Sequence, residues 1–251
     1  MHTQIEITGA KILFELPFGI TITETQVNMW IVMALITGFC IWLTHDLKVK
    51  PTSKRQVIAE FLVGMAYSFV EGNMGKKFKR FTPFIAALFS LAMFCSLSSL
   101  IGMYAPTSDL NTTIGWALVV FVMITYYKIK SSGFWGYAKG LTEPIFIMTP
   151  MNIIGEFSTP ISMAFRLFGN IASGSVISAL VYAALAWLNG VIFGWLPGFL
   201  GEWADMFPIL QLGLPAVLSL YFDIFSSILQ SFIFCMLTML YIASAAEPEE
   251  A

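Results

Sequence analysis

The chain has 251 residues, of which 57% are hydrophobic and only 11% are charged, and its net charge is −2. Soluble domains carry about 25% charged residues, so this composition excludes an ordinary water-soluble globule and predicts an integral membrane protein. The chain has no excess of basic residues, so a nucleic-acid partner is not expected.

Three apolar stretches in the first half of the chain are long enough to cross about 30 Å of hydrocarbon. They are residues 27–44, 81–103 and 112–130. The residues before them are polar and then briefly amphipathic, with no cationic segment followed by a cleavage site, so no cleaved signal peptide is expected.

Residues 54–73, between the first two spans, place apolar side chains near helical spacing between charged ends. These side chains are Val57, Phe61, Met65 and Phe69. The pattern predicts an amphipathic helix on the membrane surface, with a soluble connector helix as the alternative.

Positive charge predicts the orientation, because Lys and Arg accumulate in cytoplasmic loops. If the three spans alternate, nearly all these residues fall on one side, which is then the cytoplasm. They are Lys48, Lys50, Lys54, Arg55, Lys76, Lys77, Lys79, Arg80, Lys128, Lys130 and Lys139. The N-terminus and the loop at 104–111 then face outward, and the polar tail after residue 245 is cytoplasmic.

The second half of the chain contains two helical candidates that are too long to stand upright in a membrane. Residues 151–188 would be about 57 Å long and residues 213–245 about 50 Å. They either break, with Pro160 and Pro215 as candidate sites, or lie strongly tilted as a hairpin. We therefore predict an all-α polytopic membrane protein with five to six membrane helices and a surface helix, forming a single membrane domain over residues 1–251.

Three ionisable residues lie at membrane depth, where charges are costly and mark functional sites: Arg166, Asp223 and Glu156. Arg166 is the only Lys or Arg after residue 140. Polar and small residues occur at three- and four-residue steps on either side of Arg166 and of Asp223, so each long helix carries a polar stripe. The stripes are Ser162, Arg166, Gly169, Asn170 and Ser173 on the first helix, and Ser219, Asp223, Ser226 and Gln230 on the second.

The stripes have structural alternatives. Small residues serve helix packing, Asn and Gln can bond between helices, and Arg166 with Asp223 could form a buried ion pair. A guanidinium stays protonated and cannot relay a proton, so a fixed cation suits a moving carboxylate, which could lie on another protein.

No catalytic constellation, phosphate-binding loop or metal-ligand spacing occurs, so the chain is not expected to be an enzyme by itself. The three cysteines lie inside apolar runs, and their odd number argues against a disulfide framework or metal cluster. Neither a metal nor a cofactor is expected. A stand-alone ion or solute transporter is the main alternative, although no internal repeat supports it, and a structural scaffold is a third possibility.

The segments "SMAFRLFGNIASG" and "FDIFSSILQSFIFCMLTMLYIA" occur in this order, preceded by "PTSDLNTTIGWALVVFVMITYYKIKSSGFWGYAKGL". Together they resemble the a-subunit of the membrane sector of F-type ATP synthases, over roughly residues 25–246. The resemblance implies a stator beside a rotating ring of c-subunits, with two half-channels that deliver ions to the ring carboxylates. Arg166 matches the family arginine, Asn170 the asparagine one turn further on, and Gln230 the glutamine that faces the arginine.

Two positions depart from the common bacterial pattern. Ser175 stands where many relatives carry glutamate, and Asp223 stands where they carry histidine, so the acid of the outer half-channel is expected at Asp223. Asn152 occupies a position where an acid is frequent, and Glu156 is the candidate substitute in the cytoplasmic half-channel.

The resemblance also implies the partners: the c-ring, a b-subunit peripheral stalk, the rest of the F-type ATP synthase and the lipid bilayer. A bacterial plasma membrane is the expected location. The coupling ion is either the proton, the commoner choice in the family, or sodium, because the ring carboxylate that selects it belongs to another chain.

Overall fold

The computed structural model describes residues 10–17, 20–45, 47–49, 53–143, 145–193, 217 and 220–246. The first element of the described residues is a hairpin that the sequence did not predict. Strands β1 (Ile12–Leu16) and β2 (Ile20–Thr23) pair antiparallel, with Phe14 opposite Ile22. The residues between the two long helical candidates lie mostly outside the described residues, as do Pro215 and most of the polar C-terminal tail.

Long helices make up nearly all of the rest of the described chain. In order they are α1 (Glu24–Thr44), α2 (Lys54–Met74), α3 (Thr82–Leu97), α4 (Leu110–Gly140), α5 (Thr149–Phe193) and, after a π-helical segment at Leu220–Ser226, α8 (Ser227–Ala246). Five of these are long and apolar enough to cross a membrane, and α2 is not among them. The predicted all-α polytopic fold is confirmed.

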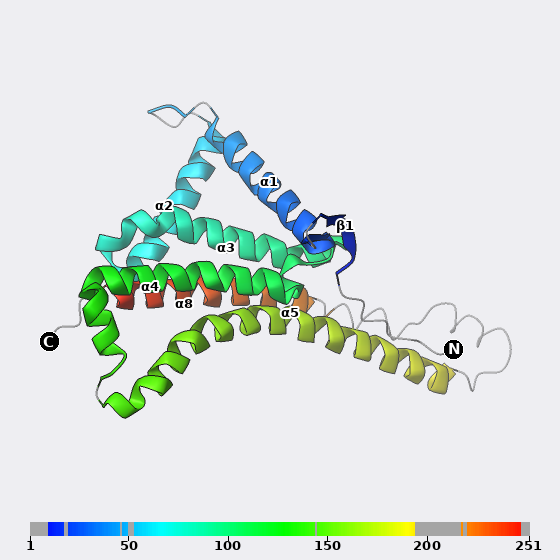
Figure 1. The fold of residues 1–251 in the computed structure, drawn as a ribbon. Helices are drawn as coiled ribbons and strands as arrows, with labels where there is room; N and C mark the ends of the chain where they lie inside the picture. Colours follow the sequence, from blue (N-terminus) through cyan, green and yellow to red (C-terminus); the bar gives the residue numbers. More distant parts are fainter. Residues whose placement is uncertain are drawn as a thin grey trace.

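The core lies where α3, α4 and α8 pack together, with α5 against α4 and α2 against α3 and α8 (Figure 1). Its largest fully buried side chains come from three of these helices: Ile85 of α3, Leu167 of α5, and Phe234, Met239 and Ile242 of α8. Helices α5 and α8 run in opposite directions, as expected for a hairpin. Helix α5 lies at the edge of this bundle, and Arg166 is exposed on it.

Polar side chains fasten the start of α1 to the start of α4. Asp109 caps α4 by accepting a hydrogen bond from the Asn111 backbone N–H at 3.0 Å. Its other carboxylate oxygen accepts from the Thr25 hydroxyl at 2.8 Å. Nearby, the Asn28 side chain donates to the Tyr104 carbonyl at 2.9 Å. These bonds fix the loop between α3 and α4 that was expected to face outward.

Helix α4 extends further than the predicted span of 112–130, and it changes direction at Gly133. The backbone φ there is 73°, a value that residues with a Cβ adopt at a steric cost. Figure 1 shows the last turns of α4 leaving the bundle at this point. Gly133 therefore separates the part of α4 that packs in the bundle from the seven-residue end, 134–140, that leads to α5.

Helix α5 continues without a break through Pro160, so the predicted alternative of a break there is wrong. With 45 residues it is about 67 Å long, which requires tilt in any bilayer of ordinary thickness. The helix bows, with its convex side toward α4 and its concave side away from the other helices (Figure 1). Met163, Ala164 and Leu167 are buried on the packed side.

A polar seam between α5 and α8

Arg166 lies near the middle of α5, and its side chain is exposed. It shares that side of the helix with Ser162 and Ser173, which are also exposed. A Cβ built onto Gly169 would meet no atom within 4 Å, so the space over this face is open. In the described part of the chain, Gly169 therefore does not serve close packing against another helix.

Arg166 has no ion pair or hydrogen bond with any described residue. The structural alternative of an Arg166–Asp223 ion pair is thus not found. Asp223 is half-buried in the π-helical segment and has an interaction of its own. The guanidinium remains an exposed cation on a helix that is otherwise without Lys or Arg.

Asn170 joins α5 to the segment before α8. Its Oδ1 accepts a hydrogen bond of 2.7 Å from the Ser226 hydroxyl, at the last residue of the π-helical segment. The Asn170 amide nitrogen is buried without a partner, and so is that of Gln230. A buried donor without a partner costs about 1–3 kcal/mol. We refer to Asn170, Ser226 and Gln230 as the α5–α8 seam.

The π-helical segment at Leu220–Ser226 is the local distortion that sequence reasoning missed. A π turn inserts an extra residue per turn, and such turns are frequent at functional sites. It carries both Asp223 and Ser226. Ser226 was predicted only as part of a stripe, and its bond to a residue 56 positions away had no sequence signal.

Glu156 and Asn152 lie nearer the start of α5. Glu156 forms a salt bridge with Lys128 of α4, and its side chain is only 15% exposed. Tyr137 lies close enough to interact with it electrostatically. The Asn152 amide donates to the carbonyls of Leu141 and Glu143 at 2.9 and 3.0 Å, and so holds the turn between α4 and α5.

Ser175 is exposed on α5, and its hydroxyl donates to the Ala172 carbonyl at 2.9 Å. Nine residues separate it from Arg166, which places the two on opposite sides of a helix with 3.6 residues per turn. The structure thus joins Asn170, one turn from Arg166, to Ser226, with Gln230 four residues further along the chain, but places Ser175 on the opposite side of α5 from Arg166. Asn152 lies 14 residues from Arg166, about 21 Å along the helix.

Replacing Glu156 by Gln should separate a structural role from an ionic one. Glu156→Gln and Lys128→Gln each break the same salt bridge, so both should lower stability by a similar amount, about 1 kcal/mol for a partly exposed pair. Only Glu156→Gln should slow ion transport if the carboxylate serves an ion path. Thermal unfolding in detergent and ion flux in vesicles measure the two effects, and equal transport loss in both variants would assign Glu156 a purely structural role.

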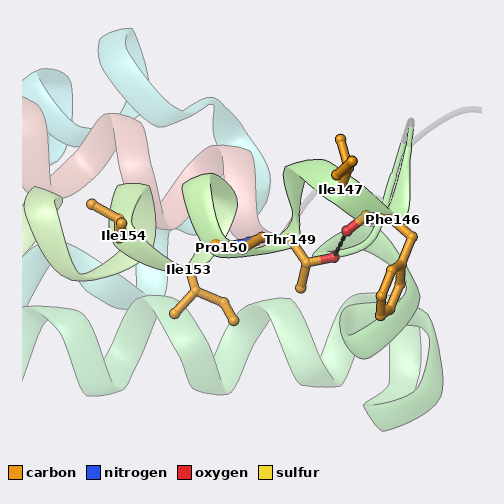
Figure 2. Close-up of a pocket in the computed structure, with 6 residues that line it drawn as sticks. All are labelled: Phe146, Ile147, Thr149, Pro150, Ile153 and Ile154. Carbon is orange, nitrogen blue, oxygen red and sulfur yellow. Dashed lines mark hydrogen bonds between the residues drawn. The ribbon is translucent and has the colours of Figure 1, made fainter.

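An apolar pocket of about 620 Å³ opens at the start of α5, well away from Arg166. Figure 2 shows its lining, which is Phe146, Ile147, Thr149, Pro150, Ile153 and Ile154. The Thr149 hydroxyl donates to the Phe146 carbonyl at 2.6 Å, which leaves almost no polar group for a ligand. This pocket does not suit ions. Among the described residues, no group of His, Cys, Asp and Glu could hold a metal.

Comparison with known proteins identifies the family. The family model described as ATP synthase A chain matches residues 26–243. "ATP synthase subunit a, sodium ion specific" of Propionigenium modestum is 31% identical over 94% of this chain and 84% of its own length. "ATP synthase subunit a 2" of a Picosynechococcus species is 30% identical, covering 98% and 95%, and "ATP synthase subunit a" of Desulforamulus reducens is 33% identical, covering 92% and 82%. The predicted resemblance is confirmed, and the chain belongs to the ATP synthase A chain family.

Proposed function

We propose that this chain is the ion-translocating stator subunit of an F-type ATP synthase, working beside a ring of c-subunits. It performs no covalent chemistry. It supplies two half-channels and one fixed cation, and ion flow through them turns the ring that drives ATP synthesis. The observation that carries this proposal is the open face of α5 with its unpaired Arg166.

The curvature of α5 supports a rounded partner on that face. Long helices usually curve with the convex side toward solvent, because they wrap around their own core. Helix α5 does the opposite (Figure 1). Its outward surface is concave, and the helix exposes Ile161, Phe165 and Leu180 as well as Arg166. A cylinder of packed helices would complement both the shape and the apolar character of this surface.

Each candidate site residue then has a role. Arg166 attracts a ring carboxylate that has released its ion and blocks direct leakage between the half-channels. The amide donors of Asn170 and Gln230, which have no partner within the described chain, can bond the water that hydrates this carboxylate. Asp223 serves the outer half-channel, while Glu156, with Asn152, lies toward the cytoplasmic one. Ser175 is uncharged, although many relatives carry an acid at this position of α5.

The proposed surroundings follow from the same assignment. The chain lies in a bacterial plasma membrane with its N-terminus outside and its C-terminus in the cytoplasm, and it contacts a b-subunit stalk as well as the ring. The positive charges at the ends of α2, α3 and α4 favour this orientation. The relative from Propionigenium modestum is described as sodium ion specific, so sodium and the proton are both retained as coupling ions.

Cysteine cross-linking in native membranes tests the proposed interface. Ser162→Cys and Ser173→Cys place thiols on the open face of α5, and each should cross-link to cysteines introduced in the helix that bears the ring carboxylate. Val119→Cys is the matched control, because Val119 is also exposed, at 55%, but on α4. Cross-linking from Val119 alone would contradict the interface.

Reconstitution of the purified chain without other subunits distinguishes the alternative. A stand-alone transporter would move ions through vesicle membranes by itself. The proposed stator should show no coupled transport until the ring and the catalytic sector are added, because the mobile carboxylate belongs to the ring.

A further inference from the structure

A cluster of cations and tyrosines joins the starting end of α3 to α4. The segment Lys76–Phe81 forms a short 3₁₀ helix before α3 and buries Phe78 and Phe81. Because these two rings are anchored in the core, the four cations between and beside them are held at the surface. They are Lys76, Lys77, Lys79 and Arg80, all exposed.

Aromatic side chains of α4 hold two cations in place. The Arg80 guanidinium donates a hydrogen bond of 3.2 Å to the Tyr127 hydroxyl and lies 5.6 Å from the centre of that ring. Lys130 Nζ lies 5.9 Å from the centre of the Tyr126 ring. The two tyrosine rings are in edge contact at 5.2 Å. Arg80 and Lys130 therefore flank one tyrosine pair.

The charge of this cluster is only partly neutralised within the described chain. Lys79 pairs with Glu71 at 3.0 Å, and Lys128 pairs with Glu156. No described carboxylate forms an ion pair with Arg80, Lys130, Lys76 or Lys77. A guanidinium braced by an aromatic ring suits the oxygens of a phosphate, which it can bind with two parallel hydrogen bonds.

An apolar strip on α4 leads away from the cations. Val119, Val122 and Tyr126 are 55%, 64% and 56% exposed. With Lys130 they follow at steps of three, four and four residues, so they share one side of the helix. A polar ligand gains nothing from such a strip, whereas an acyl chain buries it at about 25 cal/mol per Å².

We propose that this site binds an anionic phospholipid of the membrane surface layer. Arg80 and Lys130 contact the phosphate, and one acyl chain lies along Val122 and Val119. The site combines a charged end with an apolar strip, which matches the two parts of a lipid and not those of free phosphate. It lies on the segment before α3 and on α4, apart from Arg166, and does not depend on the proposed ion transport.

Native mass spectrometry of the purified full chain, and of the complex that contains it, tests this site. Phosphatidylglycerol and phosphatidylcholine with identical acyl chains are titrated separately. A cation at an anionic surface contributes about a fivefold preference, so the wild type should retain phosphatidylglycerol at least about tenfold more tightly. Arg80→Gln and Lys130→Gln should each reduce that ratio about fivefold. Glycerol phosphate, which lacks acyl chains, should not displace the lipid.

Two control variants separate charge from shape. Lys139→Gln removes an exposed α4 cation that pairs with Glu143 at 3.5 Å beyond the Gly133 bend, and it should leave the lipid ratio unchanged. Val122→Asn should weaken both lipids equally. Equal binding of the two lipids by the wild type, a loss as large in Lys139→Gln, or displacement by glycerol phosphate would each overturn the proposal. So would a preference in the isolated chain that vanishes in the complex, because another subunit would then cover the site.

Discussion

Replacing Arg166 by Ala is expected to abolish both ATP synthesis and ATP-driven ion pumping, while the chain still inserts and assembles. The side chain is exposed and makes no described intramolecular bond, so its removal breaks nothing within the chain. An ionised ring carboxylate that passes α5 would lose its counter-charge. A cation 4 Å away contributes about 4 kcal/mol at an effective dielectric of 20, which corresponds to roughly a thousandfold in rate.

The same variant should increase passive ion leakage through the membrane, because the fixed cation no longer separates the half-channels. Arg166→Lys keeps the charge but replaces the planar guanidinium by a compact ammonium, and an intermediate rate is expected. Ser173→Ala is the matched control, since Ser173 lies on the same side of α5 and its hydroxyl bonds only to the helix backbone. Dye quenching in inverted vesicles measures pumping, and immunoblotting measures assembly. ATP-driven pumping that survives in Arg166→Ala would refute the assignment.

The membrane helices were predictable because their signal is local. A run of about 20 apolar residues can satisfy its backbone groups in lipid only as a helix. Predicted residues 54–73 correspond to α2 at Lys54–Met74, and predicted residues 27–44 to α1 at Glu24–Thr44. The β-hairpin was missed because its strands have only five and four residues, and the apolar run Ile12–Phe14 does not alternate. The bend at Gly133 was missed because a glycine permits a positive φ without requiring one.

The candidate site was predicted as residue types, but not as an arrangement. Arg166 was identifiable as the only Lys or Arg after residue 140. The Asn170–Ser226 bond depends on the direction of two helices and on a π turn, and no pattern within either helix encodes these. Glu156 was predicted as an ion-path residue, whereas its pairing with Lys128 depends on the packing of α4 against α5. Contacts between distant segments follow from tertiary packing, which a single sequence determines but does not display.

Replacing Asp223 by Asn is expected to slow ATP-driven pumping by about a hundredfold, the lower end of what a positioned acid–base group contributes. Asn has nearly the same shape and keeps one carbonyl oxygen, so the half-buried position should still pack. It cannot exchange a proton or balance a sodium ion at neutral pH. If Asp223 is the carboxylate of the outer half-channel, ions then reach the ring only across an uncharged stretch.

Asp109→Asn provides the matched control, because it makes the same chemical change in another carboxylate of this chain. Asp109 caps α4 and accepts from Thr25, and Asn caps helices about as well as Asp, so its pumping rate should remain near that of the wild type. A slow Asp223→Asn beside a normal Asp109→Asn would place the half-channel acid on the segment before α8, where Ser226 already reaches α5. Unchanged pumping in Asp223→Asn would mean that Asp223 does not replace the acid missing at Ser175. Ions would then enter by a path that does not use the Asp223 carboxylate.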